Sequence, residues 1–274
     1  MDWGLRVTEA LCGRGCLLTK PELTEDEKDM VRAAEIKALW LDRMMAKGLA
    51  AQLAFEGGVS VGFIEYMPVE LSNHHKGQGL YRVNCLDAPH TPPWAKSQAV
   101  RDSGGEVTRI PGCGRALVEA MIEDVKDKCN GIIGASNIAY SDTAGFFTKL
   151  GFEQHEAKGQ TWLIRKFAPF ELPERVTYEN RYQFQPVRGK VVVDTFWSSH
   201  CTSGPWSLVM LRDVCQELGD RVVLNEHCVD EPAELEKYGV ELRTYFNGQS
   251  VHWSYQLSKD KIRELLDGCV KEAS

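Results

Sequence analysis

The chain has 274 residues, of which 43% are hydrophobic and 26% are charged, and its formal net charge is -7 at pH 7. These values exclude disordered, collagen-like and fibrous classes, and the acidic balance argues against a nucleic-acid partner, which requires a cationic surface. No run approaches the roughly 20 apolar residues that span a bilayer, and the first residues lack the basic and long apolar segments of a signal peptide. We therefore expect a cytoplasmic protein without a membrane partner and, from its length, about two domains.

The cysteine pattern indicates reduced thiols. There are nine cysteines, an odd number, without secretory signals, which argues against a disulfide framework. Cys12 and Cys16 have the spacing C-x3-C, but no second cysteine pair completes four zinc ligands. The other candidate ligands belong to separate expected elements without metal-ligand spacing, so we expect no metal site: His200, Cys201, Cys215, His227 and Cys228.

The first clear helix is predicted to begin after Thr24. Thr24 and Glu27 have the spacing of a capping box, in which each side chain bonds a backbone N–H of the other residue. Met30 and Val31 then begin an apolar series at helical spacing. Gly48 is expected to end this helix because glycine tolerates the left-handed conformation found there.

A β-hairpin is expected over residues 50 to 67. Two strand-like runs, AAQLAFE and VSVGFIEYM, flank the pair Gly57-Gly58, which can supply the positive φ angles of a tight turn. A third strand, LYRVNCLD, follows the polar loop SNHHKGQG. After an insertion rich in Pro and Gly, the segment RIPGCGRALVEAMIEDVKDK has the form of a glycine loop that leads into a helix.

The remaining elements fall into two groups separated by a connector. GIIGAS is predicted as a strand, TAGFFTKLGF as a helix that stops at Gly151, and TWLIRKF as a closing strand. Residues 168 to 188 contain three prolines and read as a connector against the surface. Beyond them the predicted order is strand, helix, strand, helix, strand, strand, helix, with Asn247-Gly248 as the turn between the last two strands. We expect domains at 1–167 and 189–274, joined by the linker 168–188.

The glycine loop has the chemistry of an anion site. Gly112 and Gly114 let the backbone approach a ligand closely, and the start of a helix presents N–H groups and positive dipole charge. Arg109 and Arg115 add positive charge. A helix start also lowers the pKa of a thiol such as Cys113, although a small packed residue is the plainer interpretation. Taken alone, the loop is more typical of a turn that caps an ordinary helix.

In context, the loop resembles the coenzyme A loop of the GNAT N-acetyltransferase family, Q/R-x-x-G-x-G/A. A later K-x-G-F phrase of that family also has a counterpart here, and the similarity covers about residues 1 to 167. KALWLDRMMAKGL and VGFIEYMP are similar to a GNAT subgroup with a YoaP-like C-terminal domain. The matching residues are Arg109, Gly112 and Gly114, and then Lys149, Gly151 and Phe152.

This resemblance implies an α/β fold: a mixed, mostly antiparallel GNAT sheet with flanking helices, followed by a smaller thioredoxin-like α/β domain. It implies acetyl-CoA as cosubstrate, a primary amine as acceptor that attacks the thioester directly, and no metal. Pantetheine is expected along the third strand and the pyrophosphate at the glycine loop. The residues implied to bind coenzyme A are Cys85, Leu86, Asp87, Ala88, Arg109, Ile110, Gly112, Cys113, Gly114, Arg115 and Phe147.

Two features depart from the family pattern. Phe147 occupies the position where many members have a tyrosine that protonates the leaving thiolate, and Tyr140 is near in sequence but not at that position. Residues 89 to 108 lengthen a connection that is normally short, either as a lid or as a surface excursion. Without the tyrosine, water has to protonate the thiolate. These departures keep open a non-catalytic protein that binds or senses acyl-CoA.

The general base is expected on the hairpin strand that faces the acceptor in this architecture. Glu65 is the first choice, since a carboxylate there can take the proton of the attacking amine. His74, His75 and Asp87 are the alternatives. A carboxylate on a strand is more often solvated or salt-bridged, and a pair of loop histidines is more often simply exposed.

The second domain has a single cysteine where thioredoxins have two. Cys201 precedes an expected helix that begins near Pro205, so its thiol lies near a positive dipole end. A dithiol oxidoreductase needs a second cysteine three residues later, but position 204 is glycine. We therefore predict no general disulfide reduction. Cys201, with Trp197 and Trp206, is instead a candidate contact or monothiol nucleophile for a thiol-containing substrate or a protein partner.

Overall fold

The computed structural model describes residues 22, 24–56, 59–88, 111–134, 143–157, 160–200, 203–251 and 258–273. None of the helices in these ranges is long and apolar enough to cross a membrane. The contacts divide the described chain into two compact units, residues 41–176 and residues 22–40 with 177–273. The first part of the N-terminal helix, expected in the first domain, thus clusters with the second unit.

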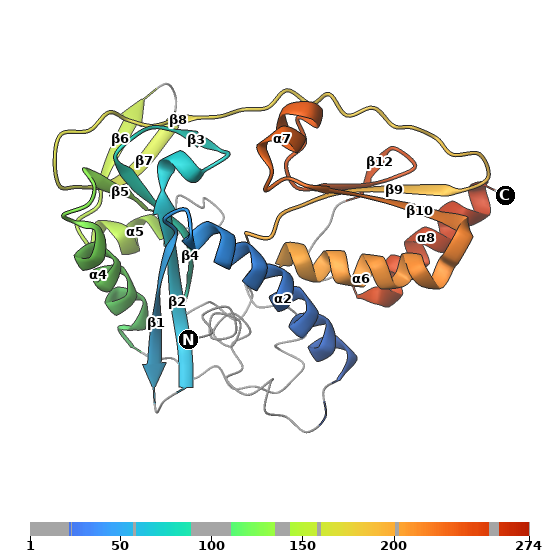
Figure 1. Cartoon of the computed structure of the whole chain (residues 1–274), viewed down its shortest axis with the longest axis horizontal. Coiled ribbons are helices and arrows are strands. Elements are labelled where there is room, and N and C mark those ends of the chain that lie inside the picture. Colours follow the sequence, from blue (N-terminus) through green and yellow to red (C-terminus); the bar gives the residue numbers. More distant parts are fainter. Residues whose placement is uncertain are drawn as a thin grey trace. The chain divides into compact units, whose positions relative to one another are not determined.

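The first unit is built on a mixed six-stranded sheet (Figure 1). Its strand order is β1-β2-β4-β5-β7-β6, and all neighbours are antiparallel except β4 and β5, which are parallel. The strands are β1 (Ala50–Glu56), β2 (Val59–Pro68), β4 (Leu80–Asp87), β5 (Gly131–Ile133), β6 (Glu153–Ala157) and β7 (Gln160–Lys166). The expected hairpin, third strand and closing strand are confirmed.

Helix α4 (Cys113–Val125) packs on one face of this sheet, which we call the α4 face. Leu117, Val118 and Met121 of α4 share a core with Ile64 of β2 and with α5 (Thr143–Thr148). The glycines end the helices as expected: Gly48 has φ +115° after α2, and Gly151 has φ +78° after α5. Because side chains alternate along a strand, neighbours of the core residues on β2 point to the opposite face.

Three strands of the first unit were not expected from the sequence. β6 is an edge strand of mixed polar residues, so it lacks the clear apolar alternation that indicates a strand. The other two are two-residue strands, β3 (His75–Lys76) and β8 (Glu174–Arg175), which pair with each other antiparallel. β8 therefore ties the start of the expected connector to the loop after η2 (Val69–Leu71).

The second unit contains a four-stranded sheet of order β10-β9-β11-β12. β9 and β10 are parallel, and the other neighbours are antiparallel. Helices α6 and α8 pack on one face and α7 on the other (Figure 1). The predicted element order is confirmed: β9 (Val191–Trp197), α6 (Ser203–Leu218), β10 (Val222–Cys228), α7 (Pro232–Tyr238), β11 (Arg243–Phe246), β12 (Gln249–Val251) and α8 (Lys259–Ala273).

The connector also contributes to the second unit. Tyr182 stacks on Tyr245 with ring centroids 4.1 Å apart, and its hydroxyl donates to Asp194 Oδ2 at 2.7 Å. The turn between β11 and β12 forms as predicted, with φ +47° at Asn247 and +77° at Gly248. Because Tyr182 packs against the core of the second unit, this part of the connector belongs to that unit.

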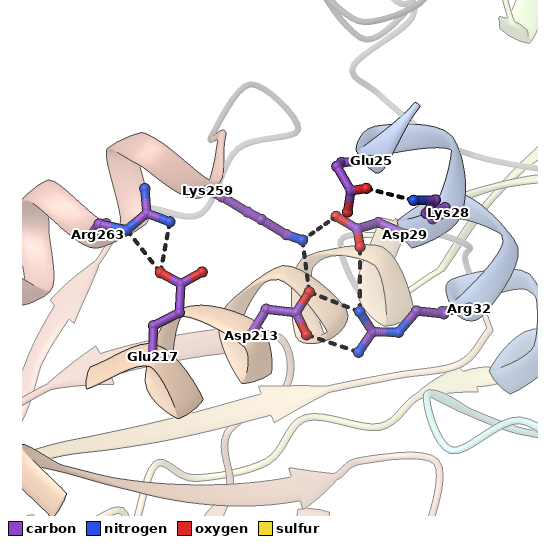
Figure 2. A network of polar contacts seen from close by, with 8 residues as sticks. All are labelled: Glu25, Lys28, Asp29, Arg32, Asp213, Glu217, Lys259 and Arg263. Carbon is purple, nitrogen blue, oxygen red and sulfur yellow. Dashed lines mark hydrogen bonds and ion pairs between the residues drawn. The ribbon is translucent and has the colours of Figure 1, made fainter. Parts of the chain in front are cut away.

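Helix α2 (Glu25–Met45) is held to α6 and α8 by an ion network (Figure 2). Arg32 donates to both carboxylate oxygens of Asp213, at 2.8 and 2.9 Å. Lys259 Nζ lies 2.8 Å from Asp29 Oδ2 and 2.7 Å from Asp213 Oδ2. Asp29 is only 2% exposed, so its charge requires these partners. The network explains why residues 24–40 cluster with the second unit.

Candidate functional site

A β-bulge brings Asn84 to Glu65. Glu65 lies opposite Cys85 and Tyr66 lies opposite Val83, so Asn84 is an extra residue in β4. Asn84 Nδ2 donates to Glu65 Oε2 at 3.0 Å. Glu65 has no exposed surface, and a buried carboxylate requires such hydrogen bonds. Since Tyr66 belongs to the core on the α4 face, Glu65 points to the opposite face.

The start of α4 has the conformation expected of the glycine loop. Gly112 is the N-cap residue in the left-handed region, with φ +84°, and its carbonyl accepts from the Ala116 N–H at 2.9 Å. A Cβ placed on Gly114 would lie 3.5 Å from Phe146 and 3.7 Å from Ala88. The first turn of α4 therefore lies beside the end of β4 and beside α5. N–H groups of a first helical turn have no acceptor within the helix.

β4 and β5 separate before this point. The parallel pairing covers only Leu80 to Arg82 of β4, whereas pairing with β2 continues to Asp87. Beyond Arg82, the β5 side of β4 has no strand partner among the described residues. The backbone of Cys85 to Ala88 thus leads from this edge toward the first turn of α4.

The residues implied to bind coenzyme A fall into three groups. Cys85, Leu86 and Ala88 are half-buried at the end of β4, and the Asp87 backbone is paired there with Phe63. Cys113, Gly114 and Arg115 form the first turn of α4, where the Cys113 side chain is buried and Arg115 contacts Glu119 at 3.3 Å. Arg109 and Ile110 lie outside the described residues, as do Tyr140 and the insertion 89–108.

Phe147 lies in the protein core. It has no exposed surface, and its ring packs edge-on against Phe146 at 5.3 Å and Phe152 at 4.9 Å. An enclosed ring has no surface to offer a cofactor, so the structure does not fit the contact expected of Phe147. Its half-buried neighbour Phe146 is the α5 side chain beside Gly114.

His75 is a poor candidate for the base. Burial, and then the nearby Arg82 charge, lower the pKa of His75 to about 3. An imidazolium that acidic does not readily hold a proton taken from an amine at neutral pH. His75 instead packs edge-on against Trp162 at 5.3 Å, a structural position.

In the second unit, Asp230 organises the loop after β9. The Ser198 hydroxyl donates to Asp230 Oδ1 at 2.6 Å, and the Ser199 N–H reaches Oδ2 at 2.9 Å. Cys201, which follows this loop, lies outside the described residues. A Cβ added to Gly204 would come within 2.2 Å of the Ser198 carbonyl oxygen, so position 204 has no room for any side chain.

The described cysteines and histidines form no metal centre. Within the described ranges, no three His, Cys, Asp or Glu side chains are grouped to hold a metal ion. Burial raises the pKa of the Cys215 thiol and of the Cys228 thiol to about 12, which makes both poor nucleophiles. His227 is used elsewhere, since its Nδ1 lies 3.0 Å from Glu234.

No protein-family model matches the chain, and neither does any curated protein. Solved structures similar to it include PaiA N-acetyltransferase from Thermoplasma acidophilum in complex with coenzyme A, with 13% identity over 63% of this chain and 92% of that chain, at TM-score 0.36. An acetyltransferase from Thermus thermophilus shares 15% identity over 63% and 90%, at TM-score 0.35. A GNAT-family acetyltransferase from Staphylococcus aureus shares 12% over 60% and 93%, at TM-score 0.34. Overlaps of this extent do not assign a function, which has to come from the residues of this chain.

Two site residues escaped the sequence reasoning. Asn84 was placed on the pantetheine strand but not beside Glu65, because no sequence signal reveals a bulge. Arg82 was not singled out, although it is a charged residue in a strand between the apolar Tyr81 and Val83. Phe146 and Phe147 are neighbours in α5, and only the structure shows that the Phe147 ring is enclosed whereas the Phe146 ring is half-buried.

Proposed function

We propose that the first unit binds acetyl-CoA and transfers its acetyl group to a primary amine. The observation that carries this proposal is the convergence of three elements: the first turn of α4, the end of β4 and α5. Gly112 and Gly114 give an anion close access to helix N–H groups, which suits a pyrophosphate. The β4 edge beyond Arg82 offers backbone groups in line with that turn, which suits pantetheine.

Glu65 is proposed as the general base. The amine nitrogen attacks the thioester carbonyl carbon, the carbon–sulfur bond breaks, and the products are an amide and coenzyme A. Glu65 is enclosed, so we propose that it takes the proton of the amine through water rather than by direct contact, while Asn84 holds Oε2. Water protonates the leaving thiolate, since α5 has the enclosed Phe147 where an acidic hydroxyl would be needed.

For the second unit we propose a thioredoxin-like domain that binds a thiol compound or a protein. Its sheet order, with two parallel strands followed by an antiparallel hairpin, supports this fold. The crowding at Gly204 argues against a second thiol, so Cys201 is proposed as a contact or monothiol nucleophile.

Calorimetry with acetyl-CoA tests the binding site on the full chain. Gly112→Ala should weaken acetyl-CoA binding at least about tenfold, because alanine disfavours the left-handed conformation. Gly112→Asn, which tolerates that conformation, should retain most of the affinity. Gly189 also has a positive φ with open space around it, so Gly189→Ala controls for the strain alone.

Turnover is tested with an amine library and detection of the acetylated product by mass spectrometry. Acetyl-CoA consumption that requires an amine supports the transferase. Tight binding without any consumption would instead support an acyl-CoA sensor. Unchanged binding in Gly112→Ala would remove the α4 turn from the site.

A further inference from the structure

Arg82 lies on the same face of the sheet as Glu65. Its neighbours in β4, Tyr81 and Val83, both pack in the core on the α4 face, so Arg82 points to the other face. Arg82 pairs across the sheet with Met67, two residues along β2 from Glu65. Diagonal neighbours of this kind have Cα atoms about 7 Å apart.

One nitrogen of the Arg82 guanidinium is used by the protein. Arg82 Nη1 donates to Ser72 Oγ at 2.8 Å and lies 3.3 Å from His75 Nδ1. Ser72 Oγ also accepts from the His74 N–H at 3.2 Å, so its own hydrogen is directed to His75 Nδ1 at 3.1 Å. The Ser72 hydroxyl and the His75 imidazole therefore hold the Arg82 guanidinium in place. Both groups are neutral, so neither balances the positive charge of Arg82.

The other edge of the guanidinium has no protein partner. Across the described part of the chain, neither Nε nor Nη2 of Arg82 is hydrogen-bonded, and no carboxylate forms an ion pair with it. Arg82 is half-buried, and these two nitrogens are not among the fully enclosed, unbonded side-chain atoms of the described residues. Arg175 also acts on His75, and Glu65, on this face of the sheet, forms no ion pair with Arg82 among the described residues.

A half-buried cation without a counter-ion is costly, and burial alone lowers the pKa of Arg82 to about 10. An anion bound from solution would offset that cost. The Nε and Nη2 edge of a guanidinium presents two parallel N–H donors, which match the two oxygens of a carboxylate.

We infer that Arg82 binds a carboxylate of the acyl acceptor through its Nε and Nη2 edge. Ser72 and His75 hold the guanidinium in place for this contact. Arg82 lies on the Glu65 face, about two residues away, which suits a short amino acid whose carboxylate contacts Arg82 and whose amine lies on the side of the enclosed Glu65. The identity of the bound molecule as acceptor rests on the proposed acetyl transfer, whereas the carboxylate contact does not.

The inference is tested by measuring equilibrium binding of small probes to the full chain by saturation-transfer NMR, in the absence of acetyl-CoA. The probes are β-alanine and 4-aminobutyrate, their carboxamides, and inorganic phosphate. The acids should bind wild type at least about tenfold more tightly than the amides, because only a carboxylate offers the guanidinium an opposite charge and two acceptor oxygens. Arg82→Met should abolish this preference. Arg82→Lys should keep part of it, since the charge remains without the fork.

Arg221→Met, in the second unit, is the control for loss of an arginine and should leave the preference unchanged. Urea unfolding and acetyl-CoA binding show whether Arg82→Met is folded. Equal or absent binding of acids and amides overturns the inference, as does an unchanged preference in folded Arg82→Met. Phosphate binding tighter than both acids overturns the carboxylate assignment. Acid binding that depends on Arg82 in a protein that acetylates none of these amines supports the contact and counts against the proposed transfer.

Discussion

Asn84 Nδ2 donates a hydrogen bond to Glu65 Oε2 at 3.0 Å, and this contact forms because Asn84 is the extra residue of a bulge in β4. A bulge re-aims a side chain that regular pairing would place elsewhere. The side chain of Glu65, the proposed base, is therefore held by β4 beyond the point where β4 stops pairing with β5. Asn84 is a positioning residue in this arrangement.

The first prediction concerns this pair. Glu65→Gln should lower kcat/KM for acetyl transfer about a hundredfold, the usual loss when a general base is removed. Asn84→Ala should lower kcat about tenfold and leave the acetyl-CoA Kd unchanged, because it acts only through Glu65. The double variant should be no slower than Glu65→Gln alone. Additive losses in the double variant would show that Asn84 does not act through Glu65.

The second prediction separates the two phenylalanines of α5. Phe146→Ala should weaken acetyl-CoA binding, since Phe146 lies beside Gly114, and should cost less stability than Phe147→Ala. Phe147→Ala should cost about 3 to 5 kcal/mol of unfolding free energy, as for other enclosed rings. Calorimetry and urea unfolding measure the two effects.

Phe147→Tyr tests the same assignment from the side of catalysis. The added hydroxyl would be buried in the core, so we expect a loss of about 1 to 3 kcal/mol and no gain in rate. A faster Phe147→Tyr enzyme would mean that this side chain does reach the leaving thiolate.

The third prediction uses two helical glycines of the second unit. A Cβ at Gly268 meets nothing within 4 Å, whereas one at Gly204 meets the Ser198 carbonyl oxygen at 2.2 Å. Gly268→Ala should therefore stabilise the protein by about 1 kcal/mol, the difference in helix propensity. Gly204→Ala should destabilise it by about 2 kcal/mol or more, since backbone atoms must move. Urea unfolding gives both values, and equal effects would contradict the crowding at position 204.

The same crowding predicts the redox behaviour. Wild type should not reduce insulin efficiently with dithiothreitol, because a lone thiolate at Cys201 waits for an external thiol. Gly204→Cys should not create this activity. Robust wild-type activity that Cys201→Ser removes would show that the domain is a working oxidoreductase.

The fourth prediction concerns the ion network of Figure 2. Lys259→Met leaves the enclosed Asp29 without its closest cation, so we expect the free energy of unfolding to fall by about 2 kcal/mol at pH 7. The expected loss is moderate because the Lys259 side chain is 23% exposed. Lys261→Met is the control on the same helix. Among the described residues, Lys261 pairs only with the exposed Glu264, and its removal should cost less than about 0.5 kcal/mol.

The pH dependence of this loss has a defined sign. In wild type, burial raises the pKa of Asp29, while Arg32 holds the pKa of Asp213 below its usual value. Without Lys259 the pKa of the buried Asp29 carboxyl rises further, so in the folded state Asp29 takes up a proton at a higher pH than in the unfolded state. The stability lost in Lys259→Met should therefore be largest at pH 7 and shrink as the pH falls and Asp29 takes up a proton in the folded state. A loss that grows on acidification would contradict this account.

The order of elements follows from local chemistry that is legible in the sequence. Thr24 precedes the first residue of α2, the Gly112 loop leads into α4, and Asn247-Gly248 makes the turn between β11 and β12. These signals act within a few residues through backbone conformation and capping, so the sequence alone predicts them. The same local signals led to Gly112 and Gly114, whereas the choice of Glu65 came from the family resemblance, which places the hairpin strand at the acceptor.

Tertiary structure decided the contacts between segments distant in sequence. The pairing of Glu65 with Asn84 depends on one extra residue in β4. Arg82 points away from the α4 face because its neighbours Tyr81 and Val83 pack in the core on that face. Arg32 meets Asp213 across 181 positions, which places the start of α2 with the second unit rather than the first. Such contacts depend on the strand register and on the pairing of buried charged side chains with opposite charges. Neither can be predicted from a local sequence pattern.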